Sequence, residues 1–154
     1  GIFGGGAVYT GSTVYSNIME YITIASTGNV TDFGDILGAA DNMLSASSAT
    51  RGLYLGGIET SGAPSVQNVI QYITIASTGN AQDVGDLATA VRSGGPGSNS
   101  ISGITMGGYA GPAKSNVIQE VTIATTGNAA DFGDLTQTRA DNPGAVSPNH
   151  GGLQ

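Results

Sequence analysis

The sequence predicts an all-β protein in which one unit of about fifty residues is repeated three times. The first observation is a phrase, YITIASTGN, that stands at residues 21–29 and again at 72–80, and returns as EVTIATTGN at 120–128. The copies begin 51 and 48 residues apart. A fixed period of this length indicates a repeated supersecondary unit. The second observation is that the 26 glycines, more than twice the rough ~7% average, recur at equivalent places in each unit.

Each unit begins with an apolar run that ends in paired glycines, at residues 1–6, 52–57 and 103–108. These runs predict a short strand, after which the glycines allow a turn or a close backbone approach. A polar segment follows, and in the third unit it is three residues shorter than in the others. Variation in length predicts a surface loop. These segments span residues 7–16, 58–67 and 109–115.

The longest predicted strand of each unit begins at Asn17, Asn68 or Asn116. Both of its faces are apolar and β-branched residues dominate, which favours a strand buried on both sides. The Ser/Thr-Thr-Gly-Asn segment predicts a hairpin turn. A short return strand then ends in the sequence Gly-Asp-Ile or Gly-Asp-Leu.

A segment rich in Gly, Ser, Ala and Asn links each unit to the next, and its constant length predicts one more short strand. Four short antiparallel strands per fifty residues form the unit of a β-propeller blade. We therefore expect three blades, in repeats at approximately 1–51, 52–102 and 103–150, with 151–154 starting a fourth. Closed propellers need about four to eight blades. Either the chain is part of a longer propeller, or further copies complete the ring or form an open stack.

The order of strand, Gly-Gly, variable loop, long strand, turn and Gly-Asp-Leu resembles kelch-type blades and the galactose-oxidase-like propellers. The phrase YITIASTGNxxDFGDL is most similar to fifty-residue repeats of phage tail and virion-surface proteins. This resemblance covers all 154 residues and implies a virion or extracellular location. Kelch blades usually carry Trp in the last strand, where Phe33, Val84 and Phe132 stand in this chain.

Charge excludes several classes of partner. The net charge is −7, with only four Lys and Arg residues. Nucleic-acid binding and a polybasic membrane patch both need clustered cations. No apolar run approaches the roughly 18 residues of a membrane-spanning helix. We therefore expect neither nucleic-acid binding nor membrane insertion.

Each unit carries one Asn and two Asp residues around its turn, and closely spaced oxygen ligands beside glycine suit Ca²⁺. The alternative is that these side chains cap turns by accepting hydrogen bonds from backbone N–H groups. No other cofactor is expected. The candidate metal ligands are Asn29, Asp32 and Asp35, then Asn80, Asp83 and Asp86, then Asn128, Asp131 and Asp134.

The variable segments hold three candidate ligand-binding residues, Tyr9, Tyr15 and Tyr109. Tyrosine beside Asn, Ser and Thr on loops suits sugar rings or protein surfaces. The alternative is that these tyrosines are ordinary surface or packing residues.

Catalysis is not expected. Asp-Phe-Gly at 32–34 lacks every other kinase motif, and His150 is the single histidine. A galactose-oxidase-like copper site needs His, Tyr and Cys ligands, and the chain has no Cys. The sequence favours a non-catalytic binding or structural module that contacts a glycan, cell-surface or protein receptor. The alternatives are a self-assembling subunit whose incomplete blade is completed by a neighbouring chain, and a fragment of a galactose-oxidase-like enzyme.

Overall fold

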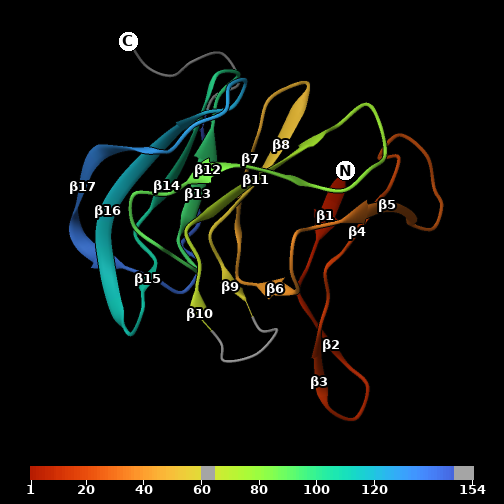
Figure 1. Ribbon diagram of the computed structural model, residues 1–154, viewed down its shortest axis with the longest axis horizontal. Coiled ribbons are helices and arrows are strands. Elements are labelled where there is room, and N and C mark those ends of the chain that lie inside the picture. Colours follow the sequence, from red (N-terminus) through yellow and green to blue (C-terminus); the bar gives the residue numbers. More distant parts are fainter. Residues whose placement is uncertain (60–64, 148–154) are drawn as a thin grey trace.

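The computed structural model describes residues 1–59 and 65–147, and every regular element in these two ranges is a β-strand. All strand pairings there are antiparallel (Figure 1). The predicted all-β class is confirmed. No helix within the described ranges is long and apolar enough to cross a membrane.

Three sheets follow one another along the chain. Sheet 1 has the strand order β1-β4-β5, and sheet 2 has β7-β8-β11-β12. Sheet 3 has β13-β14-β16-β17, and β15 is a fifth strand that also pairs with β16. The four strands named for sheet 2 and those named for sheet 3 are connected in the same order, whereas sheet 1 has three strands. Within residues 1–59 and 65–147, no strand pairs with the edge of β1 that corresponds to the β7 side of β8. The strands of sheet 1 are β1 (Ile2–Gly4), β4 (Ile18–Tyr21) and β5 (Thr31–Asp35). Those of sheet 2 are β7 (Leu44–Ser47), β8 (Arg51–Leu55), β11 (Val69–Thr74) and β12 (Gln82–Asp86). Those of sheet 3 are β13 (Gly95–Ser98), β14 (Ser102–Met106), β16 (Ala113–Thr122) and β17 (Ala130–Arg139).

The linking segments supply the first strand of the next sheet. Strands β7 and β13 both lie in these small-residue segments and pair with β8 and β14, so the prediction of a short strand there is confirmed. Sheets 2 and 3 therefore each begin with a strand that precedes the predicted start of the repeat. The longest predicted strand ends earlier than expected, since β4, β11 and β16 end at Tyr21, Thr74 and Thr122. Strand β16 also begins earlier, at Ala113, because it includes the second strand of the third hairpin.

The segments predicted as polar loops form two-stranded hairpins, which is a correction to the expected irregular structure. The hairpin of the first unit projects away from the sheets (Figure 1). Strand β6, in the first linking segment, adds to the hairpin of the second unit. The hairpin strands are β2 (Ala7–Tyr9) with β3 (Thr13–Tyr15), β9 (Ile58–Glu59) with β10 (Ser65–Val66), and β15 (Tyr109–Ala110) with the start of β16; β6 is Ala40–Asp41.

The core lies between neighbouring sheets. One cluster joins Met19 and Phe33 of sheet 1 to Tyr54 and Ile73 of sheet 2. A second cluster joins residues of sheet 2, including Leu55, to Val121 and Ile123 from sheet 3 and its turn. Burial of apolar surface is the main favourable term in folding. Each sheet is therefore stabilised largely by the sheet beside it.

The paired glycines bring the backbone of the linking segment against each sheet. Gly57, at φ +102°, donates its N–H to the carbonyl of Val91 at 2.8 Å. A Cβ on Gly108 would lie 2.4 Å from Cγ2 of Val91. Only glycine permits both this φ and this approach, so the predicted reason for the glycine pairs is confirmed.

Candidate interaction surfaces

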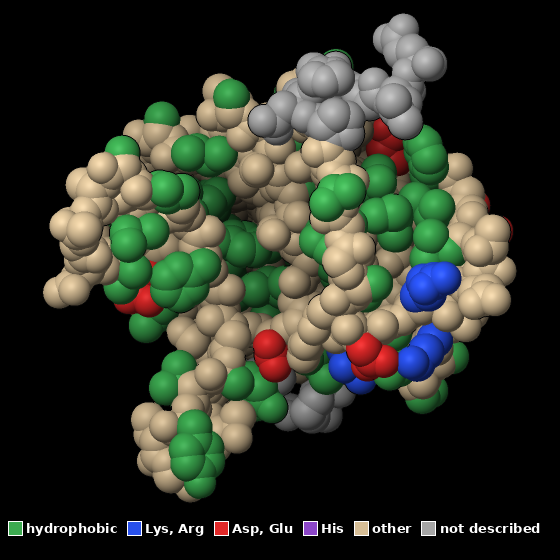
Figure 2. Space-filling model, turned by 180° about the vertical axis from the view of Figure 1, so that it is seen from behind, with side chains coloured by type: hydrophobic (Ala, Val, Ile, Leu, Met, Phe, Trp, Pro, Cys, Tyr) green, Lys and Arg blue, Asp and Glu red, His purple; other side chains and the backbone are tan. Residues whose placement is uncertain are grey.

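The β2–β3 hairpin is the most exposed regular element of the described chain. Its register pairs Val8 with Val14 and Tyr9 with Thr13. Because strand side chains alternate, Tyr9 and Tyr15 lie on one face of the hairpin, and the two valines lie on the other. Tyr9 is 79% exposed and both valines are half-exposed. Figure 2 shows hydrophobic side chains gathered on this projecting element, at the lower left.

Local sequence explains why this segment pairs with itself. Val and Tyr favour strands, and Gly11 adopts φ +94° in the connection. The N–H of Thr10 donates to the carbonyl of Ser12 at 3.1 Å, and Ser16 donates to the carbonyl of Gly6 at 2.9 Å. An isolated two-stranded hairpin is marginally stable. Apolar side chains exposed on both of its faces are typical of a surface that another molecule covers.

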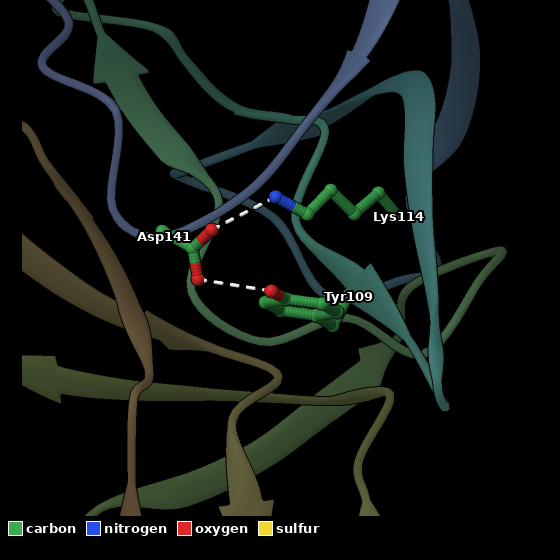
Figure 3. A network of polar contacts seen from close by, with 3 residues as sticks. All are labelled: Tyr109, Lys114 and Asp141. Atoms are coloured by element: carbon green, nitrogen blue, oxygen red, sulfur yellow. Dashed lines mark hydrogen bonds and ion pairs between the residues drawn. The ribbon is translucent and has the colours of Figure 1, made fainter.

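Tyr109 lies in a different environment, on the hairpin of sheet 3 (Figure 3). Its hydroxyl donates to Oδ1 of Asp141 at 3.0 Å, and Nζ of Lys114 contacts Oδ2 of Asp141 at 2.9 Å. The guanidinium of Arg92 lies 4.7 Å from the centroid of the Tyr109 ring. The hydrogen bond from Lys114 lowers the pKa of Asp141, and the same bond raises the pKa of Lys114. The side chain of Tyr109 is thus held by contacts within the molecule, whereas that of Tyr9 is 79% exposed.

An open groove of about 500 Å³ lies beside this network. It is lined by residues of the second and third hairpins and of the linking segment between them: Ile58, Val66, Thr89, Ala90, Arg92, Ala110 and Gly111. Nε of Arg92 is buried and has no hydrogen-bond partner within the described ranges. Arg92 is the one charged residue of a largely apolar lining. Such a groove suits a ligand that carries an acidic group.

Four of the nine Asn and Asp side chains predicted as metal ligands accept hydrogen bonds from backbone N–H groups. Oδ1 of Asn80 accepts from Asp35 and Oδ1 of Asn128 accepts from Asp86, both at 3.0 Å and both across two sheets. Oδ1 of Asp83 accepts from Gly85, and Oδ1 of Asp131 accepts from Gly133, both within one strand. In the part of the chain that the structure describes, no three His, Cys, Asp or Glu residues group closely enough to hold a metal ion. The calcium hypothesis gains no support from this geometry and remains a prediction.

The Thr-Gly-Asn turns instead join neighbouring sheets. At the first junction, Gly79 donates its N–H to the carbonyl of Phe33 at 2.7 Å, and Ala81 donates to the carbonyl of Asp35 at 2.8 Å. With the bond from Asp35 to Asn80, three hydrogen bonds join residues 79–81 to residues 33–35. We call this arrangement the clasp.

The second junction repeats the clasp between residues 127–129 and 84–86. Gly127 donates to the carbonyl of Val84 at 2.7 Å, and Ala129 donates to the carbonyl of Asp86 at 2.8 Å. A Cβ on Gly85 would lie 2.4 Å from the carbonyl oxygen of Gly127, and the equivalent distance at Gly34 is 2.5 Å. Glycine in the Gly-Asp pair is therefore required for the turn to reach the strand.

Buried polar side chains between the sheets also bond to backbone. Oε1 of Gln71 accepts from the N–H of Leu37 at 2.8 Å. Gln119 accepts from the N–H of Thr89 at 2.7 Å and donates to its carbonyl at 3.1 Å. These side chains satisfy backbone groups that would otherwise be buried without partners.

His150 lies outside the described residues.

Comparison with known proteins shows the fold and not a family. No family model matches the chain, and no curated protein matches it. Among solved structures, the chain is similar to one entitled "Structure of YjhT", with a TM-score of 0.73 and 7% sequence identity. The match covers 90% of this chain and 50% of that one. The chain therefore spans about half the length of that structure, and the likeness is one of fold alone.

Proposed function

We propose that the three sheets are kelch-like blades of a β-propeller and that the chain is a non-catalytic binding or structural module. Three features support this architecture. Sheets 2 and 3 each contain four antiparallel strands that pair in chain order, to which β15 is added in sheet 3, and four such strands are the organisation of a propeller blade. Each sheet packs its face against the next, and a clasp joins both pairs.

The β2–β3 hairpin is the proposed recognition element, and its exposure is the observation that carries the proposal. Tyr9 presents an aromatic ring with a polar tip to solvent, and Val8 and Val14 add apolar area. Tyrosine gives a large, rigid contact area and a hydrogen bond, which suits the flat faces of sugar rings and protein receptors. The proposed partner is a glycan or protein on a cell surface, and the proposed location is a virion or another extracellular appendage.

The groove beside Arg92 is a second proposed contact site, separate from the β2–β3 hairpin, and it adds a charge preference. The half-buried guanidinium of Arg92 lines the groove and favours acidic ligands, because a carboxylate matches its planar donors. An acidic glycan is therefore the ligand class that the groove favours.

A glycan array and a cell-adsorption assay with the fluorescently labelled chain test the proposal. Replacing Tyr9 and Tyr15 together by serine is expected to abolish saturable binding, because it removes both aromatic rings of the hairpin. The matched control is Ile101→Ser, which changes another large, exposed side chain, in the connection between β13 and β14. Binding that survives the double Tyr substitution, or that Ile101→Ser removes as fully, would contradict a recognition role for the hairpin.

A further inference from the structure

The two ends of the row of sheets carry the two halves of a clasp. On β17, Phe132, Gly133 and Asp134 occupy the positions that residues 33–35 and 84–86 occupy at the internal junctions. We call residues 132–134 the tail surface. Residues 28–30, with the neighbouring Ile24, occupy the positions of the turns at 79–81 and 127–129, and we call them the head surface.

Exposure shows that both surfaces lack the neighbour that their counterparts have. Phe132 is 62% exposed, whereas Phe33 and Val84 at the same position are 4% and 9% exposed. Ile24 is 84% exposed, whereas its counterparts Ile75 and Ile123 are 37% and 1% exposed. The apolar side chains that form the core between sheets are thus present at both ends and uncovered there.

The polar groups of the clasp are also present at both ends. In the described part of the chain, the carbonyls of Phe132 and Asp134 have no clasp partner, and neither do the N–H groups of Gly28 and Val30. A Cβ on Gly133 would meet nothing within 4 Å, although its φ of +142° matches the φ of +139° and +148° at Gly34 and Gly85. The tail surface therefore already has the backbone shape that accepts a Thr-Gly-Asn turn.

The segment 143–147 is a third element that fits a contact between the tail surface and the head surface. The N–H of Ser47 on β7 donates to Oγ of Ser98 on β13 at 3.3 Å, and the N–H of Ser98 donates to Oγ of Ser147 at 3.0 Å. Ser147 therefore makes the same contact with β13 that β13 makes with β7. The segment 143–147 lies where the first strand of a fourth sheet would lie, and sheet 1 is the sheet that lacks this strand.

We infer that the tail surface of one copy binds the head surface of a second copy of this chain. Three clasp hydrogen bonds would form, Phe132 and Ile24 would be buried, and residues 143–147 would pair with the free edge of β1. The occupant is a second copy because the required surface is the one that this chain carries at its other end. Contacts of this head-to-tail kind close into a ring or continue as a stack. One copy matches half of the solved structure reported above, so two copies have about the length of the whole.

This inference does not depend on receptor binding by the β2–β3 hairpin. It is tested by the mass of the 154-residue chain in solution, by light scattering and native mass spectrometry over a range of concentrations. At about 0.15 M salt the Debye length is about 8 Å, so the net charge of −7 does not keep copies apart. A closed pair is expected at twice the 15.2 kDa of one copy.

Two end variants should weaken the pair. Ile24→Asp places a carboxylate on the head surface, and Phe132→Asp places one on the tail surface. Each is expected to weaken self-association by at least about tenfold, because an unpaired charge is costly in an apolar contact. Neither side chain contributes to the core of a single copy, so circular dichroism should show unchanged folding. Ile101→Asp is the matched control, since it changes an exposed apolar residue that belongs to neither the head surface nor the tail surface.

Mixing the two end variants separates head-to-tail contact from a symmetric one. The Ile24→Asp copy keeps an intact tail surface, and the Phe132→Asp copy keeps an intact head surface. A one-to-one complex that forms only in the mixture supports the inference. A wild-type chain that remains a single copy at every concentration, or an assembly that survives both substitutions, would overturn it.

Discussion

The side-chain oxygen of Asn80 accepts a hydrogen bond from the backbone N–H of Asp35 at 3.0 Å, although the residues are 45 positions apart. Asn80 lies in the turn of sheet 2, and Asp35 lies on the outer strand of sheet 1. The bond satisfies a donor at a strand edge that its own sheet leaves unpaired. The repeated Thr-Gly-Asn phrase therefore encodes contact between sheets as well as a turn within one sheet.

Removing this contact should destabilise a single copy. Asn80→Ala is expected to lower the free energy of unfolding by roughly 0.5–1.5 kcal/mol, the usual net value of one hydrogen bond. Urea unfolding at equilibrium measures the change, in a Phe132→Asp background that keeps the chain as a single copy. Asn29→Ala is the matched control, because Asn29 has the same turn sequence and no sheet against it. A loss as large for Asn29→Ala as for Asn80→Ala would contradict the role assigned to the clasp.

Glycine in the Gly-Asp pair should matter for two separable reasons. Gly85→Ala and Gly133→Ala impose the same backbone strain, since φ is +148° and +142°, and such strain costs about 1–3 kcal/mol. Only at Gly85 would the new Cβ also meet a carbonyl oxygen, at 2.4 Å. Gly85→Ala should therefore be clearly the more destabilising change. Thermal unfolding of the two variants, again in a single-copy background, gives the difference, and equal melting temperatures would show that the close approach is unimportant.

The sequence predicted the strands because their signals are local. The apolar runs before the glycine pairs, the β-branched phrase and the constant linking segments each identify a strand within a few residues. The clasp was not predicted, because it pairs Asn80 with a residue of the preceding repeat, and no signal within one repeat shows that pairing. This also explains why these Asn and Asp residues suggested a metal site. Their side-chain oxygens can bind a metal ion, but they can equally well accept a hydrogen bond from a backbone N–H group in another sheet.

The hairpins could have been predicted, and the reason that they were not is instructive. Ala-Val-Tyr and Thr-Val-Tyr flank Gly11 with the residue types of two short strands. Variation in length among the three repeats favoured an irregular loop. Strand pairing and length variation are compatible, because the third hairpin shortens its connection and retains its pairing.

Phe33 and Phe132 occupy the same position in two repeats, but they should differ sharply in their contribution to stability. Phe33→Ala is expected to cost about 3–5 kcal/mol, because the ring is buried between sheets 1 and 2. Phe132→Ala should change the stability of a single copy by at most about 0.5 kcal/mol, the usual range for surface positions. Chemical unfolding of both variants tests this contrast. A large loss for Phe132→Ala at concentrations where the chain is a single copy would mean that its ring is packed within one copy.

The contact between Lys114 and Asp141 should make a pH-dependent contribution to stability. The hydrogen bond from Lys114 lowers the pKa of Asp141 from its ordinary 3.8. A lowered carboxyl pKa gives stability that is present above pH 3.8 and is lost as the pH falls through the lower, folded value. The stability difference between the native chain and Asp141→Asn should therefore be constant near neutral pH and shrink in acid. Unfolding followed from neutral to strongly acidic pH tests this, and a difference that persists in strong acid would contradict it.

Tyr54 should make the fold sensitive to alkali. Its side chain is buried between sheets 1 and 2, and this burial raises the pKa of its hydroxyl from 10.0 to about 12. A phenol whose folded pKa is raised gives stability that is fully present below pH 10 and is lost as the pH rises toward 12. The free energy of unfolding should therefore fall across this interval, and the fall should be smaller in Tyr54→Phe.

Tyrosinate absorbance provides an independent measurement for the same residue. One tyrosine of the native chain should ionise only around pH 12, together with unfolding, and that late step should be missing in Tyr54→Phe. Tyr9→Phe is the control, because this substitution removes an exposed hydroxyl and should leave the late step in place. Loss of the late step in Tyr9→Phe, or its persistence in Tyr54→Phe, would show that alkaline unfolding originates elsewhere in the chain.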